Sequence, residues 1–324
     1  MTAGDAGEAA LIEAMSVRVP RAPSPCGPGD DAALLPAGPA RCVTTDALME
    51  GVHFLRAHPA AWLGWKALAV NLSDVAAMGA RPEGFVVAAA LPEDLPLRYW
   101  EGMAEGMGAL AREAGCLLCG GDIVRSPGPM SLAITAWGSL PGVRALRRDG
   151  GRVGDRVMVA GTPGRAGAGL AEWLERAAED TAWRLEPLDD VSPCLREHLR
   201  PTPPLAAGPF ALEAGAHAAM DLSDGLSTDL PRLARASGLT LVIDLDALPE
   251  DPALPGATVD ARVAGGEDFG LVALVRPEDV SRFAAEGFVE LGGAEAAGAE
   301  PVIYLRGGRP TRLSARAFTH FAID

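Results

Sequence analysis

Lysine is almost absent from this chain. Lys66 is the only one, so arginine supplies nearly all the positive charge of the 28 basic residues. Lys66 does not stand in a Gly-x-x-x-x-Gly-Lys-Ser/Thr loop, and no other lysine could complete one. The phosphate chemistry of P-loop proteins is therefore excluded. Acidic residues number 43, and the formal net charge is −15. Because no cluster of arginines stands out, the composition also argues against a nucleic-acid-binding surface.

Cysteine and long apolar runs are scarce as well. The five cysteines, an odd number in a long chain, fit reduced thiols in a cytoplasm. Cys116 and Cys119 have CxxC spacing, but no second pair completes a zinc site, so we expect them to pack in an apolar strand. No apolar run reaches about 18 residues and the N-terminus lacks a signal-peptide pattern. We therefore expect a cytoplasmic protein that does not bind membranes.

Carboxylates beside glycine or small hydroxyl residues are present in six short stretches: Gly29-Asp30-Asp31, Thr44-Thr45-Asp46, Asn71-Leu72-Ser73-Asp74, Gly120-Gly121-Asp122, Asp221-Leu222-Ser223-Asp224-Gly225 and Gly265-Gly266-Glu267-Asp268. Such oxygens are the ligands that Mg²⁺ prefers, and the ion usually shares them with substrate phosphates. A single stretch is more often a turn or a helix cap. Six of them predict a site for several metal ions and a polyphosphate, because so many carboxylates converge only around cations.

The pattern of apolar residues predicts alternating strands and helices. A length of 324 residues suits two domains, and the Gly- and Arg-rich segment 141–154 divides them into 1–142 and 143–324. The order predicts an α/β or α+β class with mixed sheets. We expect strands at 41–45, 84–91, 116–119, 131–140, 156–160, 239–245 and 271–275, and helices at 2–18, 60–78, 96–114, 166–178 and 225–236.

The longest specific motif is Lys-Ala-Leu-Ala-Val-Asn-Leu-Ser-Asp-Val-Ala-Ala-Met-Gly-Ala at 66–80. This run resembles the thiamine-monophosphate kinases, and the resemblance continues in order over essentially the whole chain. It includes Asp31 and the segments 44–54, 120–122, 144–148, 161–164, 200–201, 221–225, 265–269 and 318–321.

The resemblance implies a fold and a reaction. The fold is that shared with aminoimidazole ribonucleotide synthetase, in which the N-terminal domain forms a dimer interface and the C-terminal domain closes over nucleotide and substrate. The reaction is ATP + thiamine monophosphate → ADP + thiamine diphosphate, the final step of thiamine diphosphate biosynthesis. It implies direct in-line transfer assisted by several Mg²⁺ ions, with ATP as co-substrate, in a homodimer.

Roles for single residues are implied in the same way. Asp74, Asp122 and Asp224 would be catalytic. The metal ligands would be Asp31, Thr44, Thr45, Asp46, Asp74, Asp122, Asp221 and Asp224, with Asp30 as an alternative to Asp31. ATP would be bound by Gly121, Asp122, Arg148 and Ser223. Thiamine monophosphate would be bound by His53, Glu267 and Phe318, whose ring suits a cationic heterocycle.

Three positions depart from the family pattern. Ile123 replaces a threonine, Gly270 replaces a glutamate, and Ala114 stands near the position of an aromatic residue expected beside the nucleotide base. Two other interpretations stay open: a related enzyme with another acceptor, and a catalytically silent nucleotide-binding homologue. The retained carboxylates favour an active enzyme.

Overall fold

The computed structural model describes residues 13–15, 17–20, 38–177, 180 and 182–314. Predictions for Cys26, Asp30, Asp31 and Phe318, and most of the helix expected at 2–18, lie outside these residues. Backbone contacts divide the chain into two compact units. Unit 1 comprises Met1–Val75, Ala80–Val143 and Trp173–Val191, and unit 2 comprises Ala76–Gly79, Arg144–Glu172 and Ser192–Asp324. The main division thus falls after Val143, and two short segments cluster with the other unit.

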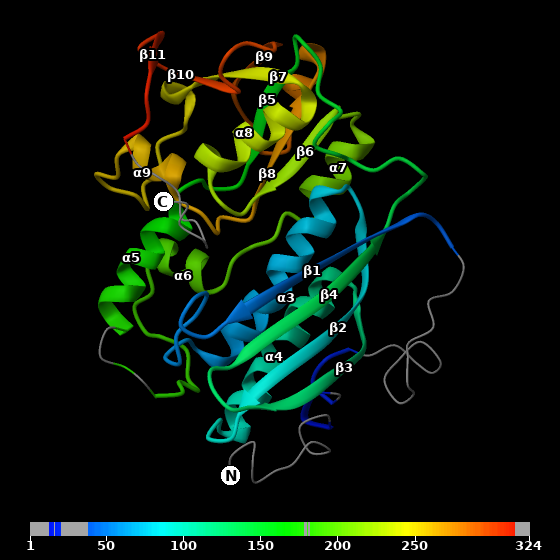
Figure 1. Cartoon of the computed structure of the whole chain (residues 1–324), viewed down its shortest axis with the longest axis vertical. Coiled ribbons are helices and arrows are strands. Elements are labelled where there is room, and N and C mark those ends of the chain that lie inside the picture. The colour runs from blue at the N-terminus through cyan, green and yellow to red at the C-terminus, as the bar shows by residue number, and fades with distance from the viewer. Residues whose placement is uncertain (1–12, 16, 21–37, 178–179, 181, 315–324) are drawn as a thin grey trace. The chain divides into compact units, whose positions relative to one another are not determined.

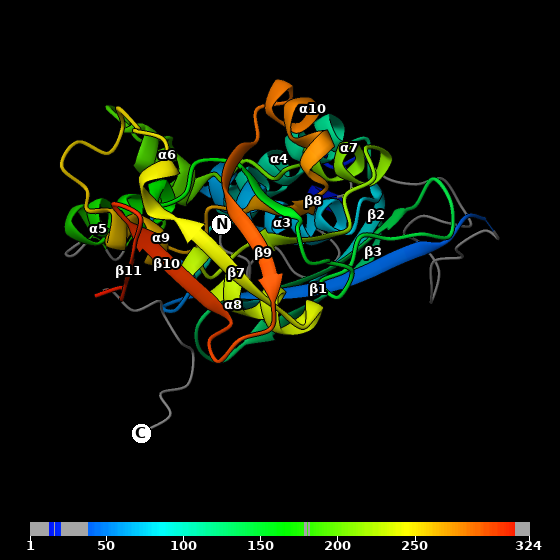
Figure 2. The same ribbon diagram turned by 90° about the horizontal axis from the view of Figure 1, so that it is seen from above.

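Unit 1 is built on a four-stranded mixed sheet with the order β1-β4-β2-β3. Its helices α3 and α4 cover one face of that sheet (Figures 1 and 2). The elements of unit 1 are β1 (Arg41–Met49), α3 (Ala60–Ala77), β2 (Arg81–Pro92), α4 (Leu97–Ala114), β3 (Leu117–Ser126) and β4 (Ser131–Ser139).

The two helices pack backbone against backbone. A Cβ atom added at Gly64 would lie 1.8 Å from the carbonyl oxygen of Met103, and one at Gly106 would lie 1.7 Å from that of Ala61. Only glycine allows this approach. Trp100 of α4 is completely buried.

The other face of the unit 1 sheet is exposed. Along β1, the side chains of Val43, Thr45, Ala47 and Met49 are exposed, whereas the alternate positions are partly or fully buried. This period of two means that the intervening side chains are directed at the helix side of the sheet. Thr44 and Asp46 therefore face α3.

Unit 2 contains a seven-stranded mixed sheet with the order β11-β10-β7-β9-β5-β8-β6. Helix α8 packs on one face, and α7 and α10 pack on the other (Figure 2). The elements of unit 2, including α5 at its edge, are β5 (Arg156–Ala160), α5 (Arg165–Ala177), α6 (Pro193–Leu199), α7 (Ala207–Glu213), β6 (Ala218–Leu222), α8 (Leu226–Ser237), β7 (Leu239–Asp244), η1 (Leu245–Ala247), α9 (Val259–Ala264), β8 (Gly270–Val275), η2 (Pro277–Asp279), α10 (Val280–Ala285), β9 (Val289–Ala296), β10 (Val302–Arg306) and β11 (Arg309–Thr311).

The expected class of mixed α/β sheets is confirmed, but two of the expected strands continue well past their predicted C-terminal ends. The strand expected at 41–45 continues to Met49 as β1. The strand expected at 116–119 instead continues to Ser126 as β3. Gly120 and Gly121 suggested a turn, but a Cβ atom at Gly121 would lie 2.2 Å from the carbonyl oxygen of Val87, so this glycine permits close strand pairing. Cys116 and Cys119 are buried and form no disulfide, in line with the expected packing role. Among the described residues, no helix is long and apolar enough to cross a membrane.

Candidate functional site

A cluster of oxygen atoms lies in unit 1 where β1 passes over α3. The hydroxyl of Thr44 donates a hydrogen bond to Oδ2 of Asp74 at 2.6 Å. Asp46, two residues further along the strand, lies within hydrogen-bonding reach of the same carboxyl group. Three of the predicted metal ligands are therefore brought together.

Within this cluster, the carboxyl group of Asp74 affects the pKa of Asp46. Burial, together with the charge and hydrogen bond of Asp74, raises the pKa of Asp46 to about 6. Two carboxylates side by side repel unless a proton or a cation lies between them. This donor set of one hydroxyl and two carboxylates fits Mg²⁺, which binds oxygen ligands and would supply the missing positive charge.

Asn71 fixes the backbone of the cluster. Its Oδ1 atom accepts a hydrogen bond from the amide of Asp46 at 3.0 Å, and its Nδ2 atom donates to the carbonyl of Ala67 at 3.1 Å. The side chain is fully buried. The sequence placed Asn71 in one of the six acidic stretches, but its role in positioning the strand was not predicted.

Asp122 lies on the same sheet, away from this cluster. Strand pairing aligns Asp122 with Ala88 of β2, Ala88 with Ala133 of β4, and Ala133 with Ala47 of β1. This row belongs to the exposed face, whereas Asp46 faces α3. Because β1 and β3 are opposite edges of the sheet, three strand spacings of about 4.8 Å, or roughly 14 Å in total, separate them.

Thr45 and His53 lie nearby in unit 1. The hydroxyl of Thr45 is on the exposed face, where it donates to the carbonyl of Ile134 and accepts from Thr135, both at 3.1 Å. The Nδ1 atom of His53 accepts a hydrogen bond from the amide of Met49 at 3.0 Å, which ties the turn after β1 to that strand. Gly121 precedes Asp122 on β3 and is exposed.

In unit 2, a second acidic group follows β6. Asp221 is buried near the end of the strand, and Ser223 and Asp224 form the turn into α8. Gly225 has a φ of 89°, and a Cβ atom there would lie 2.4 Å from the carbonyl of Gly265. This position therefore requires glycine, and the turn is held against the 265–269 loop.

Asp229 and Arg232 hold Asp224 in place. Arg232 donates hydrogen bonds to both carboxylates, at 3.1 Å for Asp229, and Asp229 accepts from the amide of Asp224 at 3.0 Å. Burial raises the pKa of Asp229 to about 6. These two positions were not predicted. Their signal in the sequence is an acid and a base one turn apart at the start of a helix.

The 265–269 loop carries Glu267 in a strained conformation. Glu267 and Phe269 have φ values of 66° and 45°, a region that residues other than glycine rarely occupy. The amide of Glu267 donates to the carbonyl of Ser223 at 2.7 Å, and the carboxylate lies 3.0 Å from Nδ1 of His198. Strain of this kind is concentrated at functional sites. His198, which is buried, was not predicted.

Asp268 joins this loop to the start of α5. Its carboxylate accepts hydrogen bonds from the amides of Gly164 at 2.7 Å and Ala166 at 2.9 Å. Burial raises the pKa of Asp268 to about 7, although the two amides lower it. The next residue, Gly270, departs from the family pattern for a steric reason, because a Cβ atom there would lie 2.4 Å from the carbonyl of Ala160.

Arg148 is separated from the turn at 223–224. The hydroxyl of Ser237, at the end of α8, donates to the carbonyl of Arg148 at 2.6 Å, whereas Ser223 precedes the start of α8. A helix of this length spans about 18 Å. Among the described residues, no group of three or more His, Cys, Asp or Glu side chains could hold a metal ion alone. The joint metal site therefore stays a prediction.

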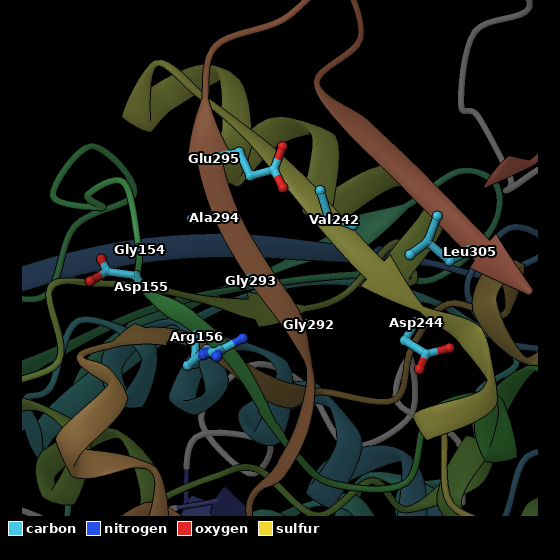
Figure 3. A pocket seen from close by; sticks show the side chains of 10 residues that line it. All are labelled: Gly154, Asp155, Arg156, Val242, Asp244, Gly292, Gly293, Ala294, Glu295 and Leu305. Carbon is cyan, nitrogen blue, oxygen red and sulfur yellow. The ribbon is translucent and has the colours of Figure 1, made fainter. Parts of the chain in front are cut away.

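A pocket of about 390 Å³ lies elsewhere in unit 2, over β5, β9, β7 and β10 (Figure 3). Arg156 lies beside Gly293, where a Cβ atom would come within 3.5 Å of its guanidinium. Asp155, Asp244 and Glu295 add three carboxylates. None of the predicted site residues lines this pocket.

Comparison with known proteins gives matches to two family models. The N-terminal domain of AIR synthase related proteins matches residues 29–140, and the C-terminal domain of the same family matches residues 152–298. Together the two matches cover most of the chain.

Similar proteins are found among curated sequences and solved structures. A thiamine-monophosphate kinase of Salmonella typhimurium is 39% identical over 94% of this chain and 95% of its own length. A crystal structure of thiamine-monophosphate kinase from Stenotrophomonas maltophilia is 36% identical, with a TM-score of 0.77 over 93% of this chain and 95% of the other. A structure of AaThiL, the Aquifex aeolicus protein, complexed with AMPPCP and TMP is 30% identical, with a TM-score of 0.77 over 99% of each chain.

Proposed function

Since this chain belongs to the thiamine-monophosphate kinases of the AIR synthase related family, we propose that it phosphorylates thiamine monophosphate to thiamine diphosphate with ATP. The single observation that carries the proposal to this chain's own residues is the cluster of Thr44, Asp46 and Asp74. A half-buried pair of carboxylates beside a hydroxyl is costly by itself and becomes favourable when a divalent cation joins it.

The cluster in unit 1 would hold Mg²⁺ through the oxygens of Thr44, Asp46 and Asp74. When bound, Mg²⁺ neutralises phosphate charge, so that two polyanions can approach each other. The residues of the chain supply positioning: Asn71 orients the strand that carries Asp46, and Thr44 orients the carboxylate of Asp74. In phosphoryl transfer this positioning is the main contribution of the protein.

The loops of unit 2 would supply the nucleotide and acceptor contacts. Asp221, Ser223 and Asp224 stand at the carboxyl end of β6, where open α/β sheets commonly bind phosphates. Glu267 offers a carboxylate that suits the cationic ring of thiamine monophosphate, and Nδ1 of His198 lies 3.0 Å from it. The strained backbone at Glu267 supports a binding role, because such strain is kept where a side chain must be aimed.

We propose a homodimer in which the exposed sheet face of unit 1 is covered. Val43 and Val124 on this face are 64% and 50% exposed. Both β1 and β3 are edge strands, which pair readily with another chain. Pairing of β1 with β3 of a second copy would also bring Asp122 of that copy to the β1 edge of the first.

The proposed compartment is the cytoplasm. Cys42, Cys116, Cys119 and Cys194 are all free thiols. Free thiols persist where the surroundings are reducing. ATP and Mg²⁺ are also available there.

Separation of thiamine phosphates by chromatography tests the acceptor. The purified chain is incubated with ATP and Mg²⁺ and with thiamine, thiamine monophosphate or no acceptor. We expect diphosphate from the monophosphate only, and none after EDTA is added. ATP binding without any diphosphate would instead favour a silent homologue, and another phosphorylated product would favour a different acceptor.

A further inference from the structure

Unit 2 contains a second pocket, of about 420 Å³, whose charged lining is entirely basic. Its lining residues are Arg144, Gly150, Arg152, Gly215, His217 and Arg276. His217 immediately precedes β6, whereas Asp221 and Asp224 lie at the other end of that strand. None of the residues predicted to bind metal, ATP or the acceptor lines this basic pocket.

We propose that the basic pocket binds a phosphate-bearing anion. Three guanidinium groups around one small volume repel each other, in a chain whose net charge is −15. Such an arrangement is favourable when a negative ligand occupies the space between the positive charges. No carboxylate is among the lining residues to take that part.

Two of the arginines are anchored by hydrogen bonds to residues outside the pocket lining. Arg276 donates to Oδ2 of Asp279 at 2.8 Å, and Arg144 donates to the carbonyl of Ala216. A guanidinium has five N–H donors in a planar fork, so these bonds leave donors for a ligand. Anchored arginines also lose less freedom when an anion binds, which favours affinity.

The guanidinium of Arg152 has its hydrogen-bond donors available for a ligand. Within the described residues, its guanidinium makes no ion pair or hydrogen bond, although its backbone amide donates to Oδ2 of Asp155 at 2.8 Å. The same Asp155 carboxylate lies 2.9 Å from Nδ1 of His217 and is almost fully buried. Asp155 thus contacts two lining residues, Arg152 and His217, although it does not itself line the basic pocket.

Two of the lining positions are glycines for backbone reasons. A Cβ atom at Gly150 would lie 2.0 Å from the carbonyl of His217, so the chain passes close to His217. Gly215 has a φ of 88°, which residues other than glycine rarely adopt, and a Cβ atom there would lie 3.8 Å from Nη2 of Arg276. Glycine at both positions therefore holds the lining backbone in place.

Charge and size define the ligand class. The planar fork of arginine matches two oxygens of a phosphate group at once. A volume of about 420 Å³ lies within the range of small-molecule sites, so there is room for pyrophosphate or for the phosphates of a small organic molecule. The pocket of Figure 3 differs, because Asp244 and Glu295 there oppose an anion.

Calorimetric titration of the full chain with pyrophosphate in EDTA tests the proposal. EDTA removes the metal on which the proposed transfer site depends, whereas guanidinium groups need none. We expect wild-type binding, and a loss of about tenfold in affinity for Arg152→Ala and for Arg276→Ala, because each removes a charge-assisted hydrogen bond. Arg156→Ala is the matched control, since it removes an exposed arginine four residues away that does not line the basic pocket.

The outcomes separate this proposal from the proposed function. Binding that requires Mg²⁺, no binding at all, or equal losses in Arg152→Ala and Arg156→Ala would overturn it, whatever the kinase activity. A second titration with ADP in EDTA identifies the source of the phosphate. Tighter binding of ADP than of pyrophosphate supports a nucleotide, and equal binding supports the phosphate chain alone.

Discussion

At the level of single residues, the proposed metal site rests on the pair Asp46 and Asp74. The two carboxyl groups lie within hydrogen-bonding reach of each other where β1 passes over α3. Partial burial and the neighbouring Asp74 raise the pKa of Asp46 to about 6. At neutral pH the pair would otherwise hold two negative charges side by side. Thr44 and Asn71 keep the pair assembled.

Replacing Asp74 by asparagine should stop turnover and leave the fold intact. Asparagine keeps an oxygen that can accept from Thr44 but removes the charge that would bind Mg²⁺. We expect kcat to fall by at least about a hundredfold, similar to the loss of other transition-state contacts. Asp94→Asn is the charge-matched control, because its carboxylate is 62% exposed and pairs with Arg56, away from the cluster. A wild-type rate in Asp74→Asn would contradict the metal role.

Glu267 allows strain and function to be separated. Glu267→Gly removes the carboxylate. It also removes backbone strain, because a φ of 66° costs any residue other than glycine about 1 kcal/mol or more. We expect thermal stability to be maintained while KM for thiamine monophosphate rises more than KM for ATP. Glu267→Gln keeps the strain and should raise the same KM. Equal effects on both substrates would show that Glu267 does not contact the acceptor.

At the level of elements, periodicity predicted the helices and strands that form the core. The run at 60–78 became α3 because its apolar side chains pack on a sheet and on α4. β6 was missed because its five residues end in Asp221 and Leu222, just before the Asp224 turn, so the acidic motif obscured a short apolar strand. β3 was cut short because Gly120 and Gly121 fit both a turn and a close strand pair.

The candidate site could likewise be predicted only in part from the sequence. Sequence proximity predicted that Thr44 and Asp46 act together, and a helix beside a strand brought Asp74 to them. The separation of Asp122 follows only from strand order, which places β1 and β3 at opposite edges. Residues such as Asn71 and His198 act through other residues, and no local pattern identifies such partners.

The link between the 265–269 loop and α5 predicts a pH dependence. The pKa of Asp268 is about 7 in the folded chain and near 3.8 when exposed, so the folded state retains a proton that the unfolded state has released. The free energy of unfolding should therefore fall as pH rises from about 4 to about 7 and then level off. Urea unfolding at pH 5 and pH 8 measures the difference. It should be smaller in Asp268→Asn, and an identical difference in both proteins would refute this assignment.

At the level of the whole molecule, the exposed sheet face and the position of Asp122 point to a shared site. If each site combines Asp46 of one copy with Asp122 of the other, Asp46→Asn and Asp122→Asn are each inactive alone. Mixed dimers of the two variants then contain one intact site. After unfolding and refolding together, we expect about a quarter of the wild-type activity, because half the dimers are mixed. No recovery would mean that both residues act within one chain.

The most direct test of the central claim is the stoichiometry of the reaction, followed by phosphorus NMR in a single sample. The sample contains the purified chain, ATP, Mg²⁺ and thiamine monophosphate. A direct kinase should form one ADP and one thiamine diphosphate for each ATP consumed, with no inorganic phosphate. Release of inorganic phosphate in place of thiamine diphosphate would contradict direct transfer to this acceptor.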